Sequence, residues 1–291
     1  MTQLILEQGL NGLQFGLMLF LLAAGLTLVF GIMDMVNLAH GSLYMVGAYI
    51  AAAVTQRGGS FALAVGVSIV ATAAIGALLE VAVLRRLYKR DHLSQVLATF
   101  ALILIANDAV RMIWGNQPVM LATPEALSGP VELGGFVYPA YRLLIVAVGI
   151  AAAGLLYWLV TRTRLGMRVR AGASNREMAR AMGVNVRLLF TLVFAIGTGM
   201  CALAGALLGP LLAVQAGMGE NILILTFVVI VVGGIGSVRG ALVGSLLVGV
   251  ADTLGRALLP ALLREVFRLD AASSLGPALA SLLIYALMAA I

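Results

Sequence analysis

Apolar runs of about 20 residues recur along the whole chain, and they restrict its fold more than any other feature. A helix rises 1.5 Å per residue, so a run of this length crosses the roughly 30 Å hydrocarbon core of a bilayer. Charged residues make up only 10% of the chain, too few to cover the surface of a soluble domain. The alternation typical of transmembrane β-strands is absent from these runs. The sequence therefore predicts an all-α polytopic membrane protein.

We expect about eight or nine membrane segments, which form a single domain over residues 1–291. The expected segments are 9–32, 38–55, 61–84, 93–114, 141–160, 188–214, 222–232, 240–259 and 272–290. The segment 222–232 has about half the length of a full span and runs into a glycine-rich stretch, a poor helix former. It is either a broken or half-spanning helix near Gly233, or a full span that continues through the glycines.

Basic residues cluster beside the spans in two short segments, 85–90 and 162–187. Lys and Arg concentrate in cytoplasmic loops, so both segments are expected on the cytoplasmic side. Counting spans from there places the N-terminus outside and the C-terminus inside. Three arginines count against this topology, because they fall in a loop that it places outside: Arg256, Arg264 and Arg268.

Several kinds of chemistry lack the residues that they require. Lys89 is the single lysine and follows Tyr88, so no Gly-Lys-Ser/Thr phosphate loop is present. The two histidines, His40 and His92, lie far apart, and Cys201 is the single cysteine, which excludes an intrachain disulfide and disfavours a zinc site. We therefore expect no enzyme activity, metal or cofactor in this chain, and a structural, buried role for Cys201.

Polar residues inside the apolar runs mark a candidate translocation path. They are Asn37, His40, Gly41, Tyr44, Asn107 and Asp108. In a helix, Asn37, His40 and Tyr44 would share one face, and polar groups at this depth usually face a cavity or a partner. The alternative for the first group is a short cytoplasmic turn in which Asp34 or Asn37 caps the next helix. The alternative for Asn107 and Asp108 is a bond to a neighbouring helix.

A series of five glycines follows the short segment. It consists of Gly233, Gly234, Gly236, Gly240 and Gly244. Small residues four apart allow two helices to pack closely, which is one interpretation. The other is a broken helix whose free backbone groups face the substrate route. A weak similarity between 38–55 and 240–259 also suggests an internal repeat, although chance explains it about as well.

The polar insert 161–187 carries seven arginines between two spans. Within it, Ser174 or Asn175 is expected to cap a short helix, and Glu177 would complete a capping box with Ser174. Gly183 is expected to end this helix. The predicted apolar edge is Met178, Ala179 and Met182, and the predicted charged edge is Arg176, Glu177 and Arg180. A helix of this kind either rests on anionic lipid or docks a soluble partner.

Three blocks resemble the branched-chain amino-acid ABC transporter permeases, the LivH-like family. They are the opening region 25–51, the end of the insert at 177–186, and the glycine-rich region 233–254. The resemblance implies a permease subunit of a binding-protein-dependent importer, in the bacterial cytoplasmic (inner) membrane. It also implies a second homologous permease, two ATPase subunits that bind the ATP, and an extracytoplasmic solute-binding protein.

By the same resemblance, the short helix of the insert is the coupling element that sits in an ATPase cleft. Its residues are Ser174, Arg176, Glu177, Ala179, Arg180, Met182 and Gly183. Leucine, isoleucine and valine are the usual solutes, while relatives of this kind also handle urea or short amides. The competing hypothesis is a stand-alone secondary transporter or channel, in which Asp34 and Asp108 would be ion sites. A membrane enzyme is disfavoured by the missing catalytic residues.

Overall fold

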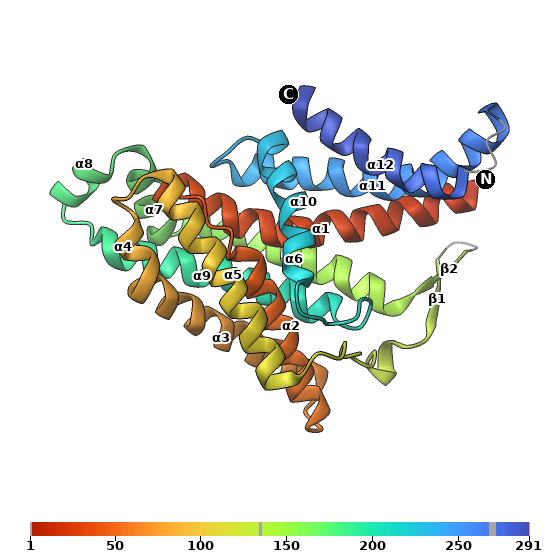
Figure 1. Ribbon diagram of the computed structural model, residues 1–291, viewed down its shortest axis with the longest axis horizontal. Coiled ribbons are helices and arrows are strands. Elements are labelled where there is room, and N and C mark those ends of the chain that lie inside the picture. Colours follow the sequence, from red (N-terminus) through yellow and green to blue (C-terminus); the bar gives the residue numbers. More distant parts are fainter. Residues whose placement is uncertain (1, 134–135, 268–271, 291) are drawn as a thin grey trace.

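The computed structural model describes residues 2–133, 136–267 and 272–290, and these are largely helical. Figure 1 shows an elongated bundle in which most long helices lie along the long axis. Six described helices are long and apolar enough to cross a membrane. They are α1 (Thr2–Met33), α3 (Phe61–Leu79) with its extension, α5 (His92–Trp114), α6 (Ala140–Arg162), α9 (Val186–Leu208) and α11 (Val238–Phe267). The helical membrane fold is confirmed, and the count of eight or nine segments stays a prediction.

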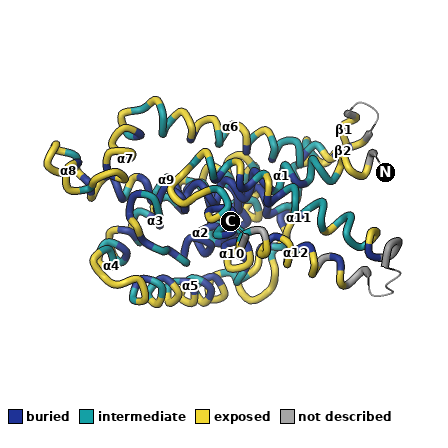
Figure 2. Tube along the Cα trace, turned by 90° about the horizontal axis from the view of Figure 1, so that it is seen from above, coloured by how far each residue is buried: buried dark blue, intermediate teal, exposed yellow. Residues whose placement is uncertain are grey.

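Helix α1 is the centre of the bundle, and every residue from 17 to 29 is buried. A helix that is apolar on all sides needs neighbours on all sides, and α1 packs against α6, α9, α10 and α11. Its contact with α11 is close because a Cβ on Gly12 would lie 2.8 Å from the Cα of Val250. In Figure 2 the buried trace runs through the middle, while α5, α6 and α8 carry the exposed stretches.

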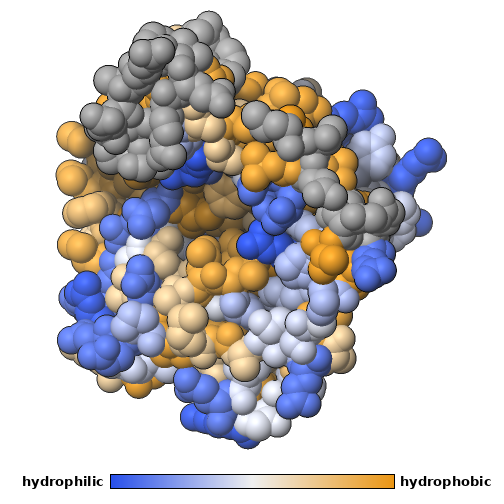
Figure 3. All heavy atoms as spheres, turned by 90° about the vertical axis from the view of Figure 1, so that its right-hand side faces the viewer, coloured by the Kyte–Doolittle hydropathy of each residue, from blue (hydrophilic) through white to orange (hydrophobic). Residues whose placement is uncertain are grey.

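The outer faces of α5 and α6 are apolar. Phe100 and Leu104 of α5 are about half exposed, as are Leu155 and Trp158 of α6. In a soluble protein such surfaces would be unfavourable, but in a bilayer they contact lipid tails. Figure 3 views the molecule from the end that carries the N-terminus, where hydrophilic side chains gather and an apolar flank lies to one side.

A short β-hairpin lies at that end and was not expected. Strands β1 (Pro130–Leu133) and β2 (Phe136–Pro139) pair antiparallel, and η2 (Glu125–Leu127) precedes them. The Tyr138 hydroxyl donates to Asn11 Oδ1 on α1 at 2.9 Å, and Arg142 also donates to Asn11. The sequence did not predict the hairpin, because these contacts join residues more than a hundred positions apart.

The two basic segments lie together at the opposite end, as predicted (Figure 1). The first comprises the π-helical turn η1 (Glu80–Leu84) and α4 (Arg85–Leu87); the second comprises α7 (Arg164–Ser174) and α8 (Arg176–Ala181). Arg256 lies towards the other end, since α11 runs antiparallel to α1. Its guanidinium bonds Asp252 at 2.8 Å. The side chains of Arg264 and Arg268 lie outside the described residues.

Three further helices complete the described chain: α2 (His40–Gln56), α10 (Met218–Gly233) and α12 (Ala272–Ala290). Helix α12 returns along α11, and a Cβ on Gly255 of α11 would lie 3.1 Å from Ala280 Cβ. Helices α2 and α10 are each too short for a full span, 17 and 16 residues. Both begin inside the bundle after a non-helical segment, and their N-termini form the candidate site.

Candidate translocation and coupling sites

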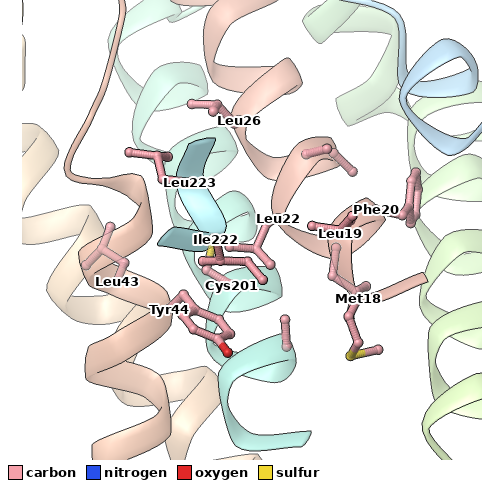
Figure 4. Close-up of a cluster of buried hydrophobic side chains, with 14 of the residues drawn as sticks. Met18, Leu19, Phe20, Leu22, Leu26, Leu43, Tyr44, Cys201, Ile222 and Leu223 are labelled. Carbon is pink, nitrogen blue, oxygen red and sulfur yellow. The ribbon is translucent and has the colours of Figure 1, made fainter. Parts of the chain in front are cut away.

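Helix α2 begins inside the bundle. Helix α1 ends at Met33, Asp34 takes a left-handed conformation with φ 51°, and residues 35–39 continue without helix. His40, the first residue of α2, places Nε2 2.9 Å from the Sγ of Cys201, in the middle of α9. Figure 4 shows Tyr44 and Leu43 of α2 beside Cys201 of α9 and the α1 side chains. The N-terminus of α2 therefore lies near mid-depth.

Helix α10 begins at the same place. Gly217, with φ 88°, precedes its first turn, and Gly219 lies against Gly41. A Cβ on either glycine would overlap the carbonyl oxygen of the other, so the two helix N-termini touch through their backbones. From this junction α2 runs towards the hairpin end, where Tyr49 meets Trp114, and α10 runs towards the basic end.

The chain enters the junction between Gly41 and Gly219 twice, once after α1 and once after α9, and these two helices run in opposite directions. Helix α1 runs towards the basic end and α9 runs away from it; each is followed by a non-helical segment, 34–39 or 209–217, and then by a half-helix. Inverted pairs of interrupted helices are typical of transporters. The weak repeat suggested between 38–55 and 240–259 stays a prediction.

The first three polar residues of the predicted path are enclosed. Asn37 and His40 have no exposed surface, and Tyr44 has 1%. Asn37 lies before the helix, so its predicted shared face with His40 and Tyr44 does not form. Its Oδ1 accepts from the Ala39 N–H at 3.1 Å, a local turn, but Ala39 is the N-cap of α2 and no side chain caps it, so the expected cap by Asp34 or Asn37 is wrong. That turn is buried near mid-depth, however, and not at the cytoplasmic surface.

Asn107 connects α5 to the start of α10. Its Nδ2 donates to Glu220 Oε1 at 2.6 Å, and its Oδ1 accepts from the Gly217 N–H at 3.2 Å. Asn107 therefore has the alternative role given above, a hydrogen bond to a neighbouring helix. Asp108 is exposed and bonds Arg111 at 3.2 Å, so the structure does not bring it to the junction. Glu220 was not among the polar residues predicted for the path.

A cavity of about 270 Å³ lies beside the junction. Its polar side chains are the phenol of Tyr44 and the amides of Gln215 and Asn221, and the rest of its lining is mostly apolar. It has no charged side chain. Neutral hydrogen-bonding groups with apolar walls suit a small solute that carries both a polar head and an apolar side chain.

The glycine series has both of the predicted features. Gly234 and Gly236 have φ 87° and 83°, and they end α10 and turn the chain into α11. Gly233 and Gly240 lie against each other, and a Cβ on Gly244 would lie 2.8 Å from the Val229 carbonyl oxygen. The helix is therefore broken, and the broken ends pack closely. Exposure of the free backbone groups to substrate stays a prediction.

Helix α8 is capped by Asn175, one of the two predicted caps. Asn175 is extended and its Oδ1 accepts from the Met178 N–H at 2.9 Å, while Ser174 is still the last residue of α7. The Ser174–Glu177 capping box therefore does not form. Gly183, with φ 83°, ends the helix as predicted. Its N–H bonds the Arg180 carbonyl at 3.0 Å, part of the Schellman arrangement of helix ends.

The two faces of α8 also differ from the predicted edges. Ala179 is buried against the bundle, and the Arg176 guanidinium lies 5.9 Å from the ring centroid of Phe190 on α9. Both therefore face inwards, contrary to their predicted edges. The outward face carries Met178 and Met182, 60% and 78% exposed, together with three further exposed residues: Glu177, Arg180 and Ala181.

Below α8 lies a buried cluster that the sequence did not reveal. Glu80 has no exposed surface, and its carboxylate accepts from Arg85 at 2.9 Å, Tyr88 at 2.7 Å and Thr191 at 2.6 Å. Burial, and to a smaller extent the neighbouring Glu80 carboxylate, raises the pKa of Tyr88. The phenol therefore keeps the proton that it donates to Glu80. A lone glutamate in an apolar run, five residues before an arginine, was the available signal.

The cluster connects α8 to the end of α1. The Tyr88 ring meets Phe190 edge-on with centroids 5.3 Å apart, and Phe190 is the residue under Arg176. The Tyr88 hydroxyl also lies 3.7 Å from the sulfur of Met33, the last residue of α1. A continuous series of contacts thus leads from α8 to the point where the chain turns into the junction.

Known proteins resemble this chain over most of its length. Residues 9–291 match the family described as the permease component of the branched-chain amino acid transport system. The permease protein BraD of the high-affinity branched-chain amino acid transport system of Pseudomonas aeruginosa is 32% identical, over 86% of each chain. The corresponding permease LivH of Escherichia coli is 30% identical, over 90% of this chain and 89% of LivH.

More distant similarity extends to other transporters. The fructose import permease FrcC of Rhizobium meliloti is 38% identical over only 36% of this chain. A solved ABC transporter of the metal-chelate type, in an inward-facing conformation, superposes with a TM-score of 0.50 over 98% of this chain and 86% of that chain. Its 19% sequence identity supports the fold alone.

Proposed function

Because the chain belongs to the family of branched-chain amino acid transport permeases, we propose that it translocates branched-chain or related hydrophobic amino acids in an ABC importer. The chain is a membrane permease subunit, and its relatives are transport subunits of the same kind. The observation that carries the substrate proposal is the uncharged cavity at the α2–α10 junction. An amino acid is a zwitterion with an apolar side chain, which neutral amides and apolar walls accommodate together.

We further propose nine membrane segments. Six are the long apolar helices. Helix α2 with residues 34–39 and α10 with residues 209–217 would each form a composite segment, in which a short helix follows a non-helical stretch. Helix α12, 19 residues long, would be the ninth. Irregular backbone is tolerated at membrane depth where protein surrounds it, as α1 and α9 do here.

The partners follow from the family and from the exposed helix α8. ABC permeases work with ATPase subunits and a solute-binding protein, so ATP is bound by other chains; a second homologous permease is our proposal. We place α8 in the ATPase cleft through its outward face, Met178 and Met182 with Glu177 and Arg180 beside them. Methionine side chains adapt to irregular partner surfaces. Glu80, Tyr88 and Phe190 would then convey movement of α8 to the end of α1.

Uptake by reconstituted vesicles tests this function. The permease would be reconstituted with the ATPase and binding-protein subunits, and accumulation of leucine, isoleucine, valine, urea and short amides would be measured. We expect ATP-dependent accumulation of the three amino acids. Accumulation of urea or amides alone would identify the other solute class, and accumulation driven by an ion gradient without ATPase subunits would identify a secondary transporter.

A charge on the outward face of α8 should uncouple transport. We expect Met182→Asp to leave the permease folded, because the side chain is 78% exposed. ATPase co-purification and ATP-driven uptake should each fall at least about tenfold, the effect of losing about 1.4 kcal/mol of binding. The matched control is Met167→Asp on α7, a methionine 56% exposed on the neighbouring helix. Equal loss in both variants, or in neither, would reject α8 as the docking element.

A further inference from the structure

A second cavity, of about 280 Å³, lies at the basic end of the bundle. It is enclosed by the last turns of α1 and α6, by α7, and by the turn that leads into α11. Its lining includes two arginines, Arg170 and Arg239, and the hydroxyl groups of Thr27, Tyr157, Thr161 and Ser237. No carboxylate lines it. The cavity therefore has two positive charges with no counter-charge in its wall.

The two guanidinium groups are held by neutral groups. Arg239 Nη2 donates to the Tyr157 hydroxyl at 2.9 Å, and its Cζ lies 5.3 Å from the Tyr157 ring centroid. Arg170 donates to the Val160 carbonyl oxygen. Neither arginine takes part in an ion pair among the described residues. These contacts orient the guanidinium groups but leave their charge uncompensated, with further N–H groups available to an anion.

The wall also contains a buried hydroxyl with an unused hydrogen-bonding capacity. Thr27 of α1 has no exposed surface, and its Oγ1 has no hydrogen-bond partner among the described residues. Buried hydroxyls nearly always have a partner, and threonines in helices usually bond a carbonyl one turn back. The Thr27 hydroxyl therefore lies behind the cavity wall, where an occupant of the cavity does not reach it.

The cavity is placed at the level of lipid headgroups. It lies at the basic end, where both Arg-rich segments meet, and Tyr157 and Trp158 of α6 are about half exposed beside it. Aromatic residues of this kind mark the membrane interface. Above them, the exposed Leu155 begins the apolar face of α6.

We propose that this cavity binds the phosphate headgroup of an anionic phospholipid, with the acyl chains along the exposed face of α6. Basic pockets between membrane helices on the cytoplasmic side suit such headgroups in charge and in position. Arg170 and Arg239 would bond the phosphate oxygens. The site is separate from the α2–α10 junction and from the outward face of α8.

Lipid retention by the complete transporter tests this site. The assembled complex would be purified from nanodiscs that contain equal amounts of phosphatidylglycerol and phosphatidylcholine, and bound lipid would be counted by native mass spectrometry. We expect retained phosphatidylglycerol in the unmodified complex. Arg170→Gln and Arg239→Gln should each lower its retention about tenfold, while Arg162→Gln, an exposed arginine outside the cavity, should leave it unchanged. If Arg239→Gln does not assemble, Arg239→Lys replaces it, with an expected loss of about threefold.

Thr27 has a matched control elsewhere in the core. Thr72 is also fully buried, without a hydrogen-bond partner among the described residues, but lies outside the cavity. Neither Thr27→Val nor Thr72→Val should change phosphatidylglycerol retention, because neither hydroxyl is accessible to a bound headgroup.

Three results would overturn the proposal. Equal loss with Arg162→Gln would show diffuse attraction of lipid to a basic surface. Displacement of the lipid by millimolar inorganic phosphate would identify a free anion as the ligand. Retention by the isolated permease but not by the assembled complex would show that a protein partner covers the cavity.

Discussion

Arg85→Leu should destabilise the permease by about 2–3 kcal/mol, less than the roughly 3–5 kcal/mol of a fully buried ion pair because the Arg85 side chain is 32% exposed. The carboxylate of Glu80 is fully buried, so without Arg85 it would keep only the hydroxyl groups of Tyr88 and Thr191. A charge that stays buried without a counter-charge is costly. The measurement is the thermal unfolding midpoint and the folded yield of the purified permease.

Two comparisons separate the charge from the packing. Arg111→Leu breaks the exposed pair with Asp108, whose side chains are 52% and 63% exposed, and should cost less than about 1 kcal/mol. The double variant Glu80→Leu, Arg85→Leu removes both charges and should recover much of the stability lost in Arg85→Leu. If Arg85→Leu is no less stable than Arg111→Leu, the buried carboxylate is not a structural centre.

Gly219→Ala should separate the two half-helices and abolish transport. The added methyl group would overlap the carbonyl oxygen of Gly41, and neither backbone can move without displacing its helix. Overpacking of a close-packed core costs about 1–3 kcal/mol. In Gly219→Ala the overlap would lie at the contact between α2 and α10. We expect a lower unfolding midpoint and uptake reduced to background.

The matched control is Gly154→Ala on α6, where nothing lies within 4 Å of the added Cβ. It should be neutral in both assays. Gly41→Ala should resemble Gly219→Ala, and the double variant should be less than additive, because both methyl groups disrupt one contact. A Gly219→Ala protein that behaves like Gly154→Ala would show that the half-helices do not meet as described.

Sequence predicted the long spans well and the interrupted ones poorly. Length and apolarity are enough to locate α5 or α9, because the bilayer sets both requirements. Residues 38–55 are equally apolar, but their depth depends on the contact between Gly41 and Gly219, which no local pattern encodes. Residues 222–232 could be recognised as a half-helix because the glycines that end it, Gly234 and Gly236, are adjacent in sequence.

The same distinction holds for the candidate sites. Gly183 ends α8 as predicted, because helix ends depend on local backbone conformation. The inward placement of Arg176 and Ala179 depends on Phe190 and on the packing of α9, so the predicted edges were wrong. The partners of Glu80 and of Asn107 likewise come from helices distant in sequence, and only proximity in the fold identifies them.

The junction also sets an order for biosynthesis. Residues 34–39 are non-helical backbone, which a bilayer tolerates only where protein surrounds it. The neighbouring protein includes the start of α10, whose Gly219 lies against Gly41 and is synthesised 178 residues later (219 minus 41). At about 5–20 residues per second, the ribosome needs about 10–35 seconds to supply it. The N-terminal half must therefore be shielded, by the insertion machinery or near the membrane surface, until the C-terminal half arrives.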